Sequence, residues 1–181
     1  TGAARGLGRA IAESYAREGA KVMVTDIDAE GAAAVAASIE ESGGVARSAH
    51  LDTTDPQQHG DVVAQTVDAF GRLDIAANNA GITIPAVPTA ELSIDDWHKV
   101  RSVDLDGVFY GVKAQLPVML RNGGGVILAT SSIAGTRGLW GMLPYSASKH
   151  GVIGMMKTIA LEYGERGIRA LAVGPAYIKT G

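Results

Sequence analysis

A tyrosine and a lysine four residues apart, Tyr145 and Lys149, form the pair whose types and spacing best suit chemistry. On a helix, residues at this spacing share one face. A phenol has an ordinary pKa near ~10, so it is a poor base at neutral pH. An ammonium roughly 4–5 Å away favours the phenolate by about 3–4 kcal/mol at an effective dielectric of ~20. The pair therefore predicts a tyrosine that exchanges a proton with a substrate near the working pH.

Two serines, Ser131 and Ser132, follow an apolar run at 126–130 that is expected to be a strand. A hydroxyl at the end of this strand could hydrogen-bond the substrate oxygen that the phenol protonates. Taken alone, a tyrosine and a lysine at this spacing more often belong to a solvated helix face. The catalytic interpretation therefore depends on the other motifs of the chain.

The chain opens on a glycine-rich turn in which Gly2, Gly6 and Gly8 follow the spacing G-x-x-x-G-x-G. A helical pattern begins directly after it, with Leu7 on the same apolar stripe as the residues one and two turns later. Glycines let the backbone approach a pyrophosphate, and the first turn of a helix offers free N–H groups. The turn therefore predicts a dinucleotide site, although glycine turns before helices are common.

Asp26 and Arg5 make opposite predictions about the dinucleotide. Asp26 follows a buried strand at 21–25, about 20 residues after the glycine turn, where a carboxylate accepts ribose hydroxyls. Its alternative role is a turn or helix cap, for which Asp28 is better placed. Arg5 could instead meet a 2′-phosphate. Repulsion between a carboxylate and that phosphate outweighs a solvent-exposed arginine contact of ~1 kcal/mol or less, so NAD is predicted rather than NADP.

Predicted strands and helices alternate along the remaining chain. Further strands are expected at 45–50, 73–77 and 168–173, and helices at 56–70, 94–120 (bent by Pro117) and 145–163. No linker, repeat or low-complexity segment interrupts this pattern. One α/β domain with a parallel sheet, residues 1–181, is therefore predicted. The apolar segment 133–144 lies between the serine and the tyrosine, and it either lines a substrate pocket or packs in the core.

Composition excludes several classes of function. The formal net charge is −3 without a basic block, which argues against nucleic acid, and no apolar run is long enough to span a membrane. The chain has no cysteine, and its four histidines lack metal-ligand spacing, so no metal site is predicted. A cytoplasmic setting is permitted.

Together these motifs resemble the short-chain dehydrogenase/reductase family. The resemblance covers essentially the whole chain and depends on the order and spacing of seven features. They are TGAARGLG at 1–8, Asp26, Asp52, NNAG at 78–81, Ser132, YSASK at 145–149 and the segment after Gly174. It implies a Rossmann-type doubly wound parallel sheet in a three-layer α/β/α arrangement, a nicotinamide cofactor and a small alcohol or ketone substrate.

The resemblance also implies roles for individual residues. Ser132 binds the substrate oxygen, Tyr145 is the acid/base and Lys149 activates it. The family usually has asparagine in a proton relay where this chain has Asp104, so Asp104 is a fourth catalytic candidate. The implied cofactor contacts are Gly2, Arg5, Gly6, Leu7, Gly8, Asp26, Asp52, Thr53, Asn79, Ala80, Gly81, Tyr145, Lys149, Pro175, Ile178 and Thr180.

The resemblance further implies a central strand before Thr1 and more helices and a strand after Gly181. The sequence is therefore expected to be a fold truncated at both ends, unstable and inactive when produced as these 181 residues alone. A homotetramer or homodimer through the helices at 94–120 and 145–163 is also implied.

The leading interpretation is an NAD-dependent oxidoreductase acting on a secondary alcohol or ketone. One alternative is an NADPH-dependent ketone reductase resembling those for 3-oxoacyl substrates. The other is a cofactor-binding sensor module without chemistry.

Overall fold

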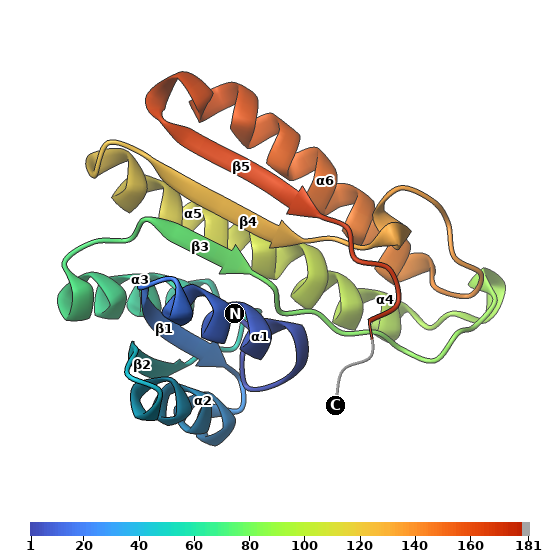
Figure 1. Ribbon diagram of the computed structural model, residues 1–181. Coiled ribbons are helices and arrows are strands. Elements are labelled where there is room, and N and C mark those ends of the chain that lie inside the picture. The colour runs from blue at the N-terminus through green and yellow to red at the C-terminus, as the bar shows by residue number, and fades with distance from the viewer. Residues whose placement is uncertain (179–181) are drawn as a thin grey trace.

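Strands and helices alternate along residues 1–178, the part of the chain that the computed structural model describes (Figure 1). The strands are β1 (Lys21–Asp26), β2 (Val45–His50), β3 (Ile75–Asn78), β4 (Gly125–Thr130) and β5 (Ile168–Val173). The helices are α1 (Gly6–Arg17), α2 (Ala29–Glu41), α3 (Pro56–Phe70), α4 (Ile94–Arg101), α5 (Gly107–Arg121) and α6 (Leu143–Tyr163). The predicted α/β class is confirmed.

All strand pairs are parallel, but they form two separate ladders. β1 pairs with β2, and the second ladder has the order β3-β4-β5. A groove of about 460 Å³, with Val22, Val62 and Phe70 in its wall, lies between β1 and β3. Within residues 1–178, neither of the two edges facing this groove has a strand partner. The parallel arrangement is as predicted, and the sheet is interrupted at this groove.

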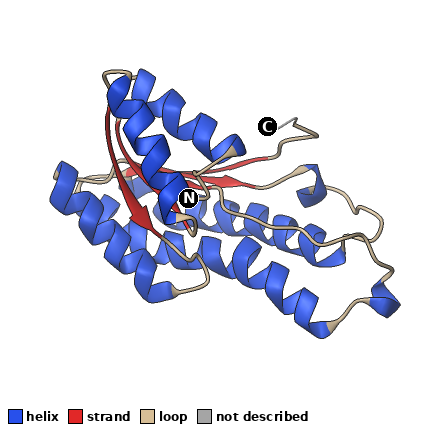
Figure 2. Ribbon diagram, turned by 90° about the horizontal axis from the view of Figure 1, so that it is seen from below, coloured by secondary structure: helices blue, strands red, loops and turns tan. Residues whose placement is uncertain are grey.

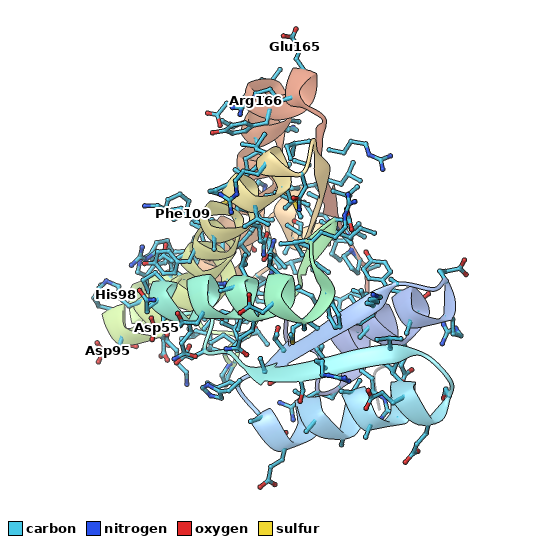
Figure 3. The ribbon with its side chains drawn as sticks, turned by 90° about the vertical axis from the view of Figure 1, so that its left-hand side faces the viewer. Asp55, Asp95, His98, Phe109, Glu165 and Arg166 are labelled. Carbon is cyan, nitrogen blue, oxygen red and sulfur yellow. The ribbon has the colours of Figure 1, made fainter. Side chains whose placement is uncertain are left out.

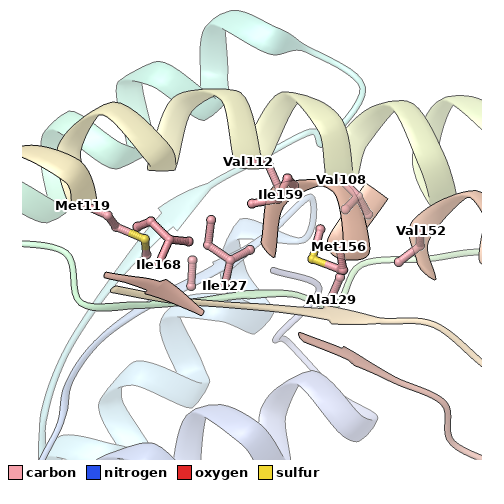
Figure 4. Close-up of a cluster of buried hydrophobic side chains, with 10 residues drawn as sticks. Val108, Val112, Met119, Ile127, Ala129, Val152, Met156, Ile159 and Ile168 are labelled. Carbon is pink, nitrogen blue, oxygen red and sulfur yellow. The ribbon is translucent and has the colours of Figure 1, made fainter. Parts of the chain in front are cut away.

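Helices cover both faces of the strands, which gives the predicted three layers (Figure 2). One core lies between β1, β2 and the helices α1 and α2, and Val24 and Ile39 are buried in it. A second core lies between the β3-β4-β5 ladder and the helices α5 and α6 (Figure 4). Met119, Ile127 and Met156 are almost fully buried there. Because apolar burial contributes roughly 25 cal/mol per Å², this second core fixes α6 against β4.

Short polar side chains begin several helices where the sequence suggests. The Asp55 carboxylate accepts a hydrogen bond from the Gln57 backbone N–H at 2.8 Å, and Pro56 occupies the first turn of α3. Asp55 lies on the outer surface (Figure 3). Asp28 caps α2 by accepting from Gly31 N–H at 2.9 Å. The prediction that Asp28 caps this helix is confirmed.

The helix predicted at 94–120 is interrupted in its middle. A π-helical turn, η2 (Ser102–Asp106), separates α4 from α5. A π turn holds extra backbone per turn and therefore redirects the side chains that it carries. Its central residue, Asp104, is fully buried. The sequence pattern does not predict this irregularity, which places a carboxylate inside the protein.

Candidate active site

The carboxyl ends of β3 and β4 meet the first turns of α6 and the π turn η2. β3 leads into Asn79, Ala80 and Gly81, while β4 leads into Ser131 and Ser132. In open parallel α/β sheets, ligands bind in the crevice outside this end of the strands. Most of the residues predicted to form the site lie at this end.

Lys149 is the buried centre of the site. Only 2% of its surface is exposed. Its ammonium donates a hydrogen bond to the backbone carbonyl of Thr130 at 3.1 Å and lies 3.2 Å from Oδ2 of Asp104. The same nitrogen lies 5.4 Å from the ring centroid of Tyr145. The structure therefore brings Tyr145, Lys149 and Asp104 together.

Tyr145 is the third residue of α6 and is partly buried, so its ring lies between the protein interior and solvent. The free N–H groups of a helix's first turn carry partial positive charge. The nearby Lys149 ammonium adds a full positive charge.

Ser132 is buried and begins a short 3-10 turn, η3 (Ile133–Gly135), at the end of β4. Its hydroxyl accepts a hydrogen bond from the Ala134 backbone N–H at 3.1 Å, so its proton is not used in that contact. The preceding Ser131 donates from its hydroxyl to the Lys149 backbone carbonyl at 2.9 Å. This bond fixes the serine turn against the helix that carries the tyrosine.

Asp104 is held from two sides. Its Oδ1 accepts a hydrogen bond from the Ile82 backbone N–H at 2.7 Å, and Oδ2 faces the Lys149 ammonium. That ion pair lies outside hydrogen-bonding geometry, so Oδ2 has no hydrogen-bond donor within the described residues. Burial raises the pKa of the Asp104 carboxyl, and the neighbouring ammonium and the Ile82 N–H only partly oppose this effect.

The glycine turn can hold a pyrophosphate close to its backbone. Gly2 and Gly6 have φ values of 64° and 57°, a region that side chains other than glycine rarely adopt. A Cβ on Gly8 would clash with the carbonyl oxygen of Gly2. Leu7 lies in the first turn of α1, whose N–H groups are available to an anion.

Asn79 ties this turn to the end of β3. Its side-chain amide donates to the carbonyl oxygens of Thr1 and Gly2 at 3.1 and 3.4 Å. In return, the Thr1 hydroxyl accepts from the backbone N–H groups of Asn79 and Ala80, both at 3.0 Å. The Asn79 side chain and the backbone N–H groups of Asn79 and Ala80 thus hold the glycine turn against the end of β3.

Asp26 ends β1 beside the glycine turn. Its carboxylate accepts hydrogen bonds from Ala4 N–H at 2.9 Å and Asp28 N–H at 3.0 Å. Carboxylate oxygens have further lone pairs, so these bonds leave room for ribose hydroxyls. Arg5 lies exposed at the start of α1, and its side chain does not cap the helix.

Asp52 and Thr53 follow β2 in a tight turn. Oδ1 of Asp52 accepts from both the backbone N–H and the hydroxyl of Thr54, at 2.9 and 2.8 Å. Thr53 is buried, and its carbonyl lies 3.1 Å from the imidazole Nε2 of His59. Both residues are therefore fixed in place, and their contact with an adenine remains a prediction.

The segment after β5 returns to the serine turn. The Pro175 carbonyl accepts a hydrogen bond from Ile133 N–H at 3.0 Å, which places this proline beside Ser132. Ile178 is 53% exposed. Thr180, the last predicted cofactor contact, lies outside the described residues.

The loop after β3 contacts the segment 133–144. The Val87 backbone N–H donates to the Gly141 carbonyl at 3.0 Å, which joins the loop after β3 to the segment 133–144. Trp140 in that segment is 78% exposed. Trp140 therefore does not pack in the core, and a role of this segment in lining a substrate pocket stays a prediction.

The sequence did not reveal three features around Lys149 and Asp104. The Thr130 carbonyl and the Ile82 N–H that holds Asp104 are backbone groups, which have no residue signature. Gly81 leaves room for the ammonium because it has no Cβ; a Cβ there would lie 3.1 Å from Nζ of Lys149. Only Ser131, adjacent to Ser132, offered a visible signal.

Among residues 1–178, no group of three or more histidine, cysteine, aspartate or glutamate side chains is arranged to hold a metal ion. In the same part of the chain, no helix combines the length and apolar character needed to cross a bilayer.

Comparison with known proteins gives consistent relatives. A family model described as short chain dehydrogenase matches residues 1–181. The chain is 43% identical over 180 residues to cyclohexanol dehydrogenase of Acinetobacter sp. (strain SE19), covering 99% of this chain and 72% of that protein. It is 40% identical over 180 residues to the 3-oxoacyl-(acyl-carrier-protein) reductase of Thermotoga maritima, covering 99% and 73%. The crystal structure of a levodione reductase superposes with a TM-score of 0.96 at 38% identity, covering 99% and 70%.

Replacing Gly81 with alanine should lower turnover. The added Cβ would lie 3.1 Å from Nζ of Lys149 and 3.2 Å from Oδ2 of Asp104, so the ion pair must shift by a few tenths of an ångström. We expect kcat to fall by about tenfold, because small displacements of catalytic groups are costly. Gly60→Ala on α3 is the control, since a Cβ there meets nothing within 4 Å. Equal kcat values for the two variants would contradict the prediction.

Proposed function

This chain belongs to the short-chain dehydrogenase family, and from that premise we propose that it transfers hydride between a secondary alcohol or ketone and NAD through Ser132, Tyr145 and Lys149. The family is one of oxidoreductases, and the chain is an enzyme acting on CH–OH groups. The proposal adds the cofactor, the residues and their roles.

The observation that carries the proposal is the burial of the Lys149 ammonium within 5.4 Å of the Tyr145 ring. Removing an ammonium from water costs several kcal/mol, on the order of the stability of a whole domain. Thr130 and Asp104 offset this cost by binding the charge. A positive charge held rigidly beside a phenol favours the phenolate, which is the form that can accept a proton from an alcohol.

In the oxidation direction, the Tyr145 phenolate takes the proton of the substrate hydroxyl. The Ser132 hydroxyl donates a hydrogen bond to the same oxygen and stabilises the charge that develops on it. Lys149 remains protonated and holds the phenolate. A bound nicotinamide supplies the acceptor or donor of the hydride. In the reduction direction, Tyr145 returns the proton to the carbonyl oxygen.

The residues present fit a dinucleotide. The glycine turn would hold the pyrophosphate, because Gly2, Gly6 and Gly8 leave its backbone accessible and α1 begins directly behind it. Asp26 would accept the hydroxyls of the adenosine ribose. Lys149 would contact the nicotinamide ribose.

The preference for NAD depends on Asp26. Its carboxylate is held at the end of β1 by two backbone N–H groups, so it cannot move away from a 2′-phosphate without breaking them. Repulsion between these groups in the crevice disfavours NADP. Arg5, which is exposed, offers only a weak opposing attraction.

An NADPH-dependent ketone reductase is the second candidate. Its support is the 40% identity to the reductase of Thermotoga maritima whose name specifies a 3-oxoacyl substrate, together with Arg5. The third alternative, a sensor module without chemistry, is set aside because the chain belongs to an oxidoreductase family.

We also propose that residues 1–181 belong to one catalytic domain that acts in the cytoplasm as a homo-oligomer. The apolar side chains of Phe109 on α5 and Leu161 on α6 are 48% and 88% exposed, which suits a contact through these helices. Phe109 points outward from α5 (Figure 3).

Tyr145→Phe should abolish most turnover without weakening cofactor binding. The change removes only the hydroxyl, so we expect kcat for a secondary alcohol such as cyclohexanol to fall roughly 10²–10⁴-fold in the active protein. Reduced-nicotinamide absorbance measures the rate, and fluorescence titration measures NAD affinity. Tyr163→Phe at the other end of α6 is the matched control. Substantial residual turnover in Tyr145→Phe would show that another group is the acid/base.

NAD should bind more tightly than NADP by at least about tenfold, because a carboxylate facing a phosphate costs more than 1.4 kcal/mol. Side-by-side titrations measure the ratio. Asp26→Asn should reduce it, whereas Asp28→Asn, a change of equal charge on the exposed cap of α2, should not. Comparable or tighter binding of NADP would reverse the assignment.

A further inference from the structure

The proposed chemistry gives Asp104 no step in the proton transfer, although its carboxylate pairs with Lys149. It is fully buried in the π turn η2, and its Oδ2 has no hydrogen-bond donor within the described residues. A buried carboxylate is costly unless it is paired. Its nearest charge is the Lys149 ammonium, 3.2 Å away. The same ammonium is the charge that favours the Tyr145 phenolate. Pairing with Asp104 therefore competes with the activation of Tyr145.

No other described ionisable side chain forms an ion pair with Lys149. On the helix side, Asp106 is paired with Arg101 at 2.9 Å, Asp96 bonds Ser93, and Asp95, His98 and Lys99 are exposed. On β5, Arg169 is exposed. The strand β4 and the turn η3 contribute no ionisable side chain.

On α6 itself, the imidazole of His150 contacts the Ser146 carbonyl at 2.9 Å, and Lys157 and Glu162 are exposed. Asp104 is therefore the anion that determines how much of the lysine's positive charge reaches the tyrosine.

We propose that Asp104 is a positioning residue that holds the Lys149 ammonium and partly neutralises it, so that Tyr145 exchanges its proton at a more alkaline pH than it would beside an unpaired lysine. This inference rests on the proposed role of Tyr145 as the acid/base. It assigns to Asp104 a function that its contacts support directly, namely that of a counter-ion.

The groups around the Asp104 carboxyl act on its pKa in opposite directions. Burial raises the pKa of Asp104, but Lys149 and the Ile82 N–H oppose the rise. An ionised Asp104 next to Lys149 disfavours the phenolate and weakens the activation of Tyr145 by the lysine.

Asp104→Asn tests this directly. The substitution keeps the size of the side chain and the oxygen that accepts from Ile82 N–H, and it removes the charge. We expect the pH midpoint for formation of tyrosinate at Tyr145 to move about 1–2 units toward acid. Tyrosinate absorbance, taken as the difference from the matching Tyr145→Phe protein, reports this midpoint without substrate. The pH midpoint of kcat for cyclohexanol oxidation should move by the same amount.

Asp106→Asn is the matched control. Asp106 lies two residues away in the same π turn and pairs with Arg101, so its loss changes net charge equally without touching Lys149. We expect its tyrosinate and kcat midpoints to stay within about 0.3 units of the parent protein. Circular dichroism and thermal melting show whether each variant is folded.

A folded Asp104→Asn protein with an unchanged midpoint, or with one moved toward alkali, would overturn the proposal. Lower activity at every pH without a shift would also overturn it, because that result indicates a purely structural role. If the asparagine variant does not fold, Asp104→Ser carries the same prediction, and failure of both to fold contradicts a positioning role.

If Tyr145 is not the acid/base, the proposed function fails and the Tyr145→Phe variant retains turnover. This result does not depend on the tyrosinate midpoints of the Asp104 variants. If only the Asp104 inference fails, Tyr145→Phe is inactive and the midpoints do not differ.

Discussion

The buried ammonium of Lys149 is the constraint on which the rest of the site depends. An ion removed from water must be paired, and four parts of the chain bind, make room for or position this lysine. The end of β4 provides a carbonyl, the π turn a carboxylate, the loop after β3 a glycine without a Cβ, and the serine turn a bond to the lysine's own carbonyl. Each contact that holds the lysine also brings its element toward the tyrosine.

The fold makes this convergence possible because parallel strands end at the same edge of a sheet. β3, β4 and β5 deliver their following loops to one crevice, and the core under α5 and α6 fixes the helices that bring Asp104 and Tyr145 there. The predicted cofactor contacts of the glycine turn and Asp26 lie on the β1-β2 ladder, where β1 ends at Asp26 beside the glycine turn. The groove between β1 and β3 separates the two ladders. Hydrogen bonds of Ala3 to β1 and of Thr1 to the end of β3 link them.

Much of this architecture could be predicted from sequence, because the relevant signals are local. Apolar runs and caps such as Asp55 identified the strands and helices, and the four-residue spacing placed Tyr145 and Lys149 on one face. The π turn could not be predicted, since its residues have no distinctive periodicity and it is stabilised by tertiary contacts of Asp104. Backbone partners such as the Thr130 carbonyl could not be predicted either, because every residue has a backbone carbonyl. Gly81 contributes by having no Cβ, and the sequence does not show that Lys149 and Asp104 lie next to the position that a Cβ would take.

The central claim is that a positive charge at Lys149 makes Tyr145 a usable acid/base. The most direct measurement is the ultraviolet titration of tyrosinate in the active protein and in its Lys149→Met variant, each corrected with the matching Tyr145→Phe protein. Methionine keeps an unbranched side chain and removes the charge. The account predicts that the tyrosinate midpoint moves at least about 1 unit toward alkali when the lysine is lost. An unchanged midpoint in a folded variant would contradict it.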